Sequence, residues 1–148
     1  EFYRYNKLAR GLLKLGGVTL DLSRVTIPIY ELAAREDHIA PAQSVLLGAK
    51  LFGGPVRFVL AGSGHIAGVI NPPTKPKYMH WVLPAGDPKT LASIEEFLAK
   101  AQEHAGSWWP DYAQWLSQYS GARVPARQPG TGPYPALEDA PGSYVKAA

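Results

Sequence analysis

A strand, a helix and a strand follow one another in the first half of this sequence, and this pattern constrains the fold more than any other feature. Residues 25–32 and 56–61 are rich in β-branched and aromatic residues, reading VTIPIYEL and VRFVLA, and each predicts a strand. Between them, Pro41 begins an apolar segment with helical periodicity over residues 42–52. This order predicts a βαβ unit with parallel strands and a right-handed crossover.

The βαβ unit brings two titratable side chains to one edge of the predicted sheet. Asp37 follows the first strand and His65 follows the second. Ligands and catalytic groups of parallel sheets collect at the carboxyl ends of the strands. Imidazole is the side chain best suited to general-base work near neutral pH, and a carboxylate on its far nitrogen fixes the tautomer. We therefore predict Asp37 and His65 as a catalytic pair, although a histidine after a strand is also common in purely structural roles.

A glycine-rich turn around His65 suggests a phosphate-binding fingerprint, but its context excludes one. The pattern Gly62-x-Gly64-x-x-x-Gly68 follows a strand, yet Pro72 and Pro73 interrupt the helix that a dinucleotide site needs. The sequence also holds no Walker motif, no His-Glu-x-x-His and no Cys/His cluster. We therefore predict neither a cofactor site nor a metal site.

No residue of the chain supplies an activated nucleophile. The chain has 148 residues and no cysteine, and it contains no G-x-S-x-G elbow. Ser63 adjoins the predicted base His65 instead of facing it. An acid followed by a base on successive parallel strands is the order found in α/β-hydrolase folds, where the nucleophile comes earlier in the chain. The nucleophile is therefore expected outside this segment, and the start at Glu1 without Met suggests a part of a longer protein.

Three further histidines are weaker candidates for catalysis. His38 adjoins Asp37 and is expected to point away or to cap the turn, while His80 and His104 have no acidic partner at a useful spacing. The net charge of +3 is too small to demand a nucleic-acid partner. No apolar run approaches the roughly 18 residues of a membrane-spanning helix, so we predict a cytoplasmic protein without a transmembrane segment.

The rest of the chain divides into helices and a tail. Residues 2–15 predict a helix with basic residues along one face, and residues 87–106 predict an amphipathic helix. Residues 108–119 predict another helix, whose aromatic face suits packing. Proline and glycine make up nearly a third of the remainder. We therefore predict a catalytic-domain portion over residues 1–120 and an extended tail over residues 121–148.

Several long strings of this sequence resemble poly(3-hydroxyalkanoate) synthases, especially those of class I. The resemblance is strong over residues 27–110. It is carried by residues 35–41 (REDHIAP), 54–60 (GPVRFVL) and 63–73 (SGHIAGVINPP), and by the shorter strings at residues 80–81 (HW), 106–111 (GSWWPD) and 141–146 (PGSYVK).

The resemblance implies a fold, a reaction and a location. The fold implied is the carboxyl-terminal portion of an α/β-hydrolase-like fold, with parallel strands and flanking helices. The reaction implied is the polymerisation of 3-hydroxyacyl-CoA into polyester with release of coenzyme A. In it Asp37 matches the family's catalytic aspartate, His65 matches its catalytic histidine, and a cysteine outside this chain is the nucleophile. Asp37 either orients His65 or acts on the substrate hydroxyl more directly. Family members act as dimers on cytoplasmic storage granules. The segment alone is then expected to be inactive.

Two other functions remain open at this point. The same fold and the same acid–base pair also suit an esterase or a polyester depolymerase, in which water accepts the acyl group. A non-enzymatic module is the second alternative, binding granules through the aromatic helix and the tail.

Overall fold

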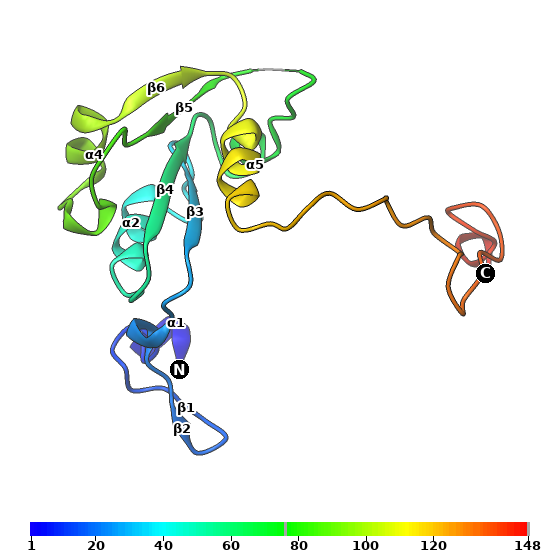
Figure 1. Cartoon of the computed structure of the whole chain (residues 1–148). Helices are drawn as coiled ribbons and strands as arrows, with labels where there is room; N and C mark the ends of the chain where they lie inside the picture. Colours follow the sequence, from blue (N-terminus) through cyan, green and yellow to red (C-terminus); the bar gives the residue numbers. More distant parts are fainter. Residues whose placement is uncertain (76, 148) are drawn as a thin grey trace.

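The computed structural model describes residues 1–75 and 77–147. Its centre is a four-stranded mixed sheet (Figure 1). The strand order is β3-β4-β5-β6. β3 and β4 are parallel, whereas β5 is antiparallel to both of its neighbours. The strands are β3 (Ile29–Ala34), β4 (Val56–Ala61), β5 (Met79–Val82) and β6 (Gln102–Ala105).

The predicted βαβ unit is present, with α2 (Ala42–Ala49) as the crossover helix between β3 and β4. The second strand begins and ends where the sequence predicts, and α2 ends three residues before the predicted end of its helix. One face of the sheet packs against α2 and α4 (Ile94–Lys100) through a cluster of buried apolar side chains. Its fully buried members are Leu46, Ala49, Leu60 and Phe97. A smaller cluster around Val59, Ala61, Val82 and Trp108 covers the opposite face.

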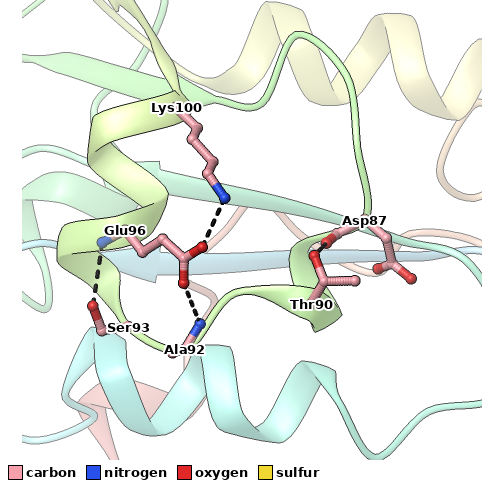
Figure 2. A network of polar contacts seen from close by, with 6 residues as sticks. All are labelled: Asp87, Thr90, Ala92, Ser93, Glu96 and Lys100. Carbon is pink, nitrogen blue, oxygen red and sulfur yellow. Dashed lines mark hydrogen bonds and ion pairs between the residues drawn. The ribbon is translucent and has the colours of Figure 1, made fainter.

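The prediction of one helix over residues 87–106 is wrong. This stretch forms a 3-10 turn, η2 (Pro88–Thr90), then α4, then β6. A capping arrangement starts α4 late: the hydroxyl of Ser93 accepts a hydrogen bond from the Glu96 amide at 3.2 Å, and the Glu96 carboxylate accepts one from the Ala92 amide at 2.7 Å (Figure 2). Lys100 donates to the other Glu96 oxygen at 2.7 Å.

In the described part of the chain, the expectation of parallel strands is correct for one pair, β3 and β4, and wrong for the other pairs of this sheet. β5 lies in a stretch for which no strand was predicted, and β6 lies inside the predicted helix. Ala101 adopts an extended conformation after α4, and the chain then pairs with β5 from Gln102 to Ala105. Hydrogen bonding to an existing strand outweighs the helical periodicity of the segment, because that periodicity is only a weak local preference.

The prediction of a helix over residues 2–15 is also wrong. Only α1 (Phe2–Tyr5) is helical there, and the chain continues into a hairpin of β1 (Lys14–Leu15) and β2 (Val18–Thr19), followed by η1 (Leu22–Arg24). Gly16 and Gly17 have φ of 54° and 80° and form the two-residue turn of this hairpin. Glycines that were expected to end a helix therefore reverse the direction of the chain.

The carboxyl-terminal part contains one helix that packs on the sheet. This helix, α5 (Trp109–Ser117), lies within the predicted residues 108–119. Beyond it the described chain leads away from the sheet (Figure 1) and forms only a 3-10 turn, η3 (Tyr144–Lys146). The division into a domain and a tail stays a prediction, and Ala148 lies outside the described residues. Across the part of the chain described here, no helix has the length and apolar character needed to cross a membrane.

Candidate active site

The turns that follow β3 and β4 lie side by side and bring the predicted pair into contact. The amide of Arg35 donates to the carbonyl of Ala61 at 2.8 Å, and the amide of Glu36 donates to that of Ser63 at 3.0 Å. These bonds continue the parallel pairing beyond the strands. Nδ1 of His65 then stands 2.7 Å from Oδ2 of Asp37, although the two residues are 28 positions apart in the sequence. The predicted proximity of Asp37 and His65 is confirmed.

The carboxylate of Asp37 is held on both oxygens. Its Oδ1 accepts hydrogen bonds from the amides of Ile39 and Ala40, at 2.8 and 2.9 Å, in the manner of an aspartate at a turn. The Asp37 side chain is only 6% exposed. The bond from the Ala40 amide, with further contributions from His65 and the Ile39 amide, outweighs desolvation and lowers the pKa of Asp37 below its usual 3.8. Asp37 is thus a fixed, ionised acceptor.

The imidazole of His65 is bound to protein at one nitrogen and open at the other. Its side chain is 47% exposed, and within residues 1–75 and 77–147 no hydrogen bond reaches Nε2. A carboxylate at Nδ1 favours the tautomer that carries its proton there, which makes Nε2 the acceptor. This arrangement suits a general base that takes a proton from a group outside the Asp37–His65 contact.

The glycine-rich turn serves close packing around His65. Ser63 has φ of 68°, a conformation uncommon for a residue other than glycine. The one-turn helix α3 (Ala67–Ile70) follows, and a Cβ added to Gly68 would overlap the carbonyl oxygen of Gly62. A Cβ on Gly62 would itself stand 3.0 Å from the carbonyl oxygen of Met79. The glycines therefore let α3 approach the end of β4.

A partly buried polar cluster, which was not predicted, joins α5 to the beginnings of β3 and β4. Asp111 of α5 accepts hydrogen bonds from the Tyr30 hydroxyl at 2.9 Å and from Nε of Arg57 at 2.8 Å, and it forms an ion pair with the Arg57 guanidinium. Burial opposes ionisation of Asp111, but the bonds from Arg57 and Tyr30 prevail and lower its pKa. Burial and the Asp111 charge raise the pKa of Tyr30. The three residues are too far apart in the sequence for any spacing to signal the cluster.

The other histidines do not join Asp37 and His65. His38 is exposed. His80 is buried, its Nδ1 lies 3.2 Å from the Gly106 carbonyl, and its ring stacks on that of His104 with centroids 5.3 Å apart. Burial lowers the pKa of His80. Among the described residues there is also no group of three or more side chains that could hold a metal ion.

This chain is similar to several poly(3-hydroxyalkanoate) polymerases. It is 53% identical over 144 residues to the poly(3-hydroxyalkanoate) polymerase subunit PhaC of Rhizobium meliloti and 51% identical over 144 residues to the poly(3-hydroxyalkanoate) polymerase of Methylorubrum extorquens, in each case over 97% of this chain and 23% of the relative. Identity to the PhaC subunit of Cupriavidus necator is 45% over 148 residues, which cover 98% of this chain and 24% of the relative.

No protein-family model matches the chain. The matched relatives are about four times as long, since the chain spans 23% to 24% of their length. The aligned residues cover 97% to 98% of this chain. The chain therefore belongs to the poly(3-hydroxyalkanoate) polymerases, as a segment of that family's longer sequence.

Proposed function

We propose that this segment supplies the base and the orienting acid of a Cys-His-Asp triad in an acyltransferase that polymerises 3-hydroxyacyl-CoA into polyester and releases coenzyme A. The observation that carries the proposal is the 2.7 Å contact between Asp37 and His65 at the ends of two parallel strands. The absence of cysteine from the chain supports a nucleophile contributed by the rest of a longer polymerase. The β3–α2–β4 unit supports an α/β-hydrolase-like fold, of which this segment is the carboxyl-terminal portion.

In the first half of the reaction, Nε2 of His65 accepts the proton of the cysteine thiol. The thiolate sulfur attacks the carbonyl carbon of the acyl-CoA and forms an enzyme thioester. The bond between that carbon and the coenzyme A sulfur breaks, and the departing sulfur takes the proton back from Nε2. An ordinary thiol, with a pKa near 8.5, is mostly protonated at neutral pH, so a neighbouring imidazole accelerates this step.

In the second half, the hydroxyl group of an acyl chain gives its proton to Nε2 of His65. Its oxygen attacks the carbonyl carbon of the enzyme thioester and forms a new ester bond. The carbon–sulfur bond to the cysteine breaks, and the proton passes from Nε2 to the cysteine sulfur. One imidazole thus serves both halves, in the way that one histidine serves acylation and deacylation in related triads.

The hydrogen bonds of Asp37 support an orienting role over direct activation of the hydroxyl. Oδ1 is occupied by the amides of Ile39 and Ala40, and Oδ2 is occupied by His65. A side chain only 6% exposed has little room to meet a substrate hydroxyl. The lowered pKa of Asp37 also makes it a weak base.

We propose on the family likeness that the polymerase acts as a homodimer at the surface of cytoplasmic storage granules, where its product gathers. The remainder of the polymerase is proposed to complete the sheet. In the described part of the chain β3 has a strand neighbour on one side only, and an open edge of this kind is normally covered or paired.

The test uses a polymerase that contains this segment together with its cysteine nucleophile. His65→Ala is expected to lower the rate of coenzyme A release from a 3-hydroxyacyl-CoA by about 10⁴-fold or more, with an unchanged circular dichroism spectrum. His38→Ala is the matched control, since His38 is exposed beside the same turn, and it should keep near-normal turnover. Near-normal coenzyme A release by His65→Ala would show that His65 is not the base.

The product of the same assay separates transfer from hydrolysis. Polyester accompanied by coenzyme A indicates transfer to a hydroxyl, and free 3-hydroxy acid indicates transfer to water. Binding to isolated granules without turnover in the wild type would favour the non-enzymatic alternative.

A further inference from the structure

The helix that follows the candidate base ends against two tryptophans. A helix leaves its last carbonyl groups without amide partners of its own, and in α3 these include the carbonyls of Val69 and Ile70. Nε1 of Trp108 donates to the Val69 oxygen and Nε1 of Trp109 donates to the Ile70 oxygen, both at 3.0 Å. His65 precedes α3 by two residues. The indole pair, Trp108 and Trp109, therefore holds the helix adjacent to the base.

The two rings of the indole pair stack on each other and differ in burial. The two rings stack with centroids 4.4 Å apart and an interplanar angle of 23°. Trp108 is 6% exposed and belongs to the core cluster on this face of the sheet, whereas Trp109 is 40% exposed. Trp109 can therefore be changed with little effect on the core, although it makes the same kind of bond.

The helix that begins with the indole pair is anchored to the strands that carry the site. Asp111 of α5 binds Tyr30 of β3 and Arg57 of β4. The Tyr30 ring also packs against Tyr112 of α5, with centroids 5.0 Å apart. α5 therefore contacts both strands and, through the indole pair, also contacts α3. The turn that carries His65 joins α3 to β4.

These contacts are important because few other contacts restrain the imidazole of His65. The ring of His65 is 47% exposed, and Asp37 makes the one hydrogen bond to it found among the described residues. In the proposed reaction Nε2 must serve two different proton transfers, and a displacement of about 1 Å can cost on the order of 100-fold in rate. A support for the backbone beside His65 therefore bears directly on turnover.

We infer that Trp108 and Trp109 are positioning residues for His65: their indole N–H groups fix α3 and, through it, the place of the imidazole against Asp37. The inference rests on the proposed role of His65 as the base. It assigns to the two tryptophans a function beyond the packing that their aromatic character predicts.

The first measurement is the rate of coenzyme A release by the polymerase that contains this segment. Trp109→Phe keeps most of the ring and removes the N–H donor, and it should lower kcat about tenfold with KM changed less than twofold. Trp108→Phe should also lower kcat. Trp115→Phe is the matched control, because Trp115 lies on the same helix and has no indole hydrogen bond among the described residues. It should keep kcat within twofold of the wild type.

The second measurement does not depend on activity. The proton on Nδ1 of His65, which lies in the bond to Asp37, should give a downfield resonance in a polymerase labelled with ¹⁵N-histidine. Trp109→Phe should broaden or abolish this resonance, and Trp115→Phe should leave it sharp. If Trp109 served stability alone, Trp109→Phe and Trp115→Phe should affect this resonance equally.

The outcomes separate this inference from the proposed function. Loss of kcat and of the resonance in Trp109→Phe, with both retained in Trp115→Phe, supports the inference. A sharp resonance and near-normal kcat in Trp109→Phe overturn it, as does an equal loss in Trp115→Phe. If Trp108→Phe fails to fold, the more exposed Trp109 still decides the matter. If His65→Ala proves active, the proposed function fails, and the resonance still reports whether the indole pair positions the ring.

Discussion

The α-carbon of Gly68 lies so close to the backbone carbonyl of Gly62 that an added Cβ would overlap the carbonyl oxygen. Gly68 belongs to α3 and Gly62 follows β4 directly, so this contact seats the helix against the end of the strand. His65 lies between the two glycines. The geometry of the candidate base therefore depends on a contact that only a residue without a side chain permits.

Gly68→Ala is expected to destabilise the polymerase locally and to slow it. Overpacking of this kind costs about 2 kcal/mol, and the displaced turn should lower coenzyme A release. Gly48→Ala is a matched control in α2, where the new Cβ would stand 3.6 Å from an oxygen of Glu31, an ordinary contact. It should leave stability unchanged or raise it by up to about 1 kcal/mol. Thermal unfolding measures the stability of both variants. Equal stability of Gly68→Ala and the wild type would show that the contact between Gly68 and Gly62 can accommodate a side chain.

Asp37→Asn is expected to lower kcat by about 10³- to 10⁴-fold with a small effect on KM. The amide keeps the shape of the side chain but loses the charge that stabilises the imidazolium, and its NH₂ group can turn toward His65 and select the wrong tautomer. The measurement is steady-state coenzyme A release at saturating acyl-CoA. A loss below tenfold would show that Asp37 has no orienting role.

The ionisation of Asp37 should not contribute to the pH dependence of activity above pH 4. Its pKa lies below the usual 3.8, because the Ala40 amide and His65 bind the charged form. A depressed folded-state pKa means that the stability from this contact is present above pH 3.8 and is lost as the pH falls through the lower folded value. A ¹³C titration of the Asp37 carboxyl should give a midpoint below 3.8, and a midpoint above 4.5 would refute the prediction.

Glu31→Gln is expected to stabilise the polymerase near pH 7 by about 1 kcal/mol, a figure reduced for solvent screening. Burial raises the pKa of Glu31 to about 6, and its Oε2 is buried without a hydrogen-bond partner among the described residues. A raised folded-state pKa means that the folded form is favoured below the ordinary 4.5 and loses that advantage as the pH rises to about 6.

Thermal unfolding between pH 4 and 7 checks the Glu31 prediction. The wild type should lose stability across this window relative to Glu31→Gln, and the two curves should converge toward pH 4. Parallel curves would mean that Glu31 finds a partner elsewhere in the polymerase.

The Arg57–Asp111 pair is expected to show a larger coupling energy than a surface pair. Asp111 is 16% exposed at its side chain and Arg57 33%, so a double-mutant cycle to alanine should give about 1–3 kcal/mol. The Glu96–Lys100 pair of α4, with side chains 37% and 57% exposed, is the control and should give about 0.5 kcal/mol or less (Figure 2). Similar coupling energies for the two pairs would show that the ion pair between Arg57 and Asp111 does not anchor α5.

The sequence by itself determined the βαβ unit and the meeting of Asp37 with His65. A β-branched run, a helix begun at Pro41 and a second apolar run are local signals, and the crossover rule for parallel strands then brings the two turns to one edge. The pair could be predicted because each of its members lies in the turn that follows a strand, and the residues of that strand specify it. The family could be recognised for a similar reason, because the strings that identify it are continuous in the sequence.

Only the tertiary structure decided the rest of the sheet and the supports of the site. β6 carries a helical pattern and becomes a strand because β5 offers it hydrogen-bond partners. The contacts of Asp111 with Arg57, and of the indole pair with α3, join segments that no spacing relates. Such contacts depend on where whole elements pack, and packing is a property of the folded chain that local preferences do not contain.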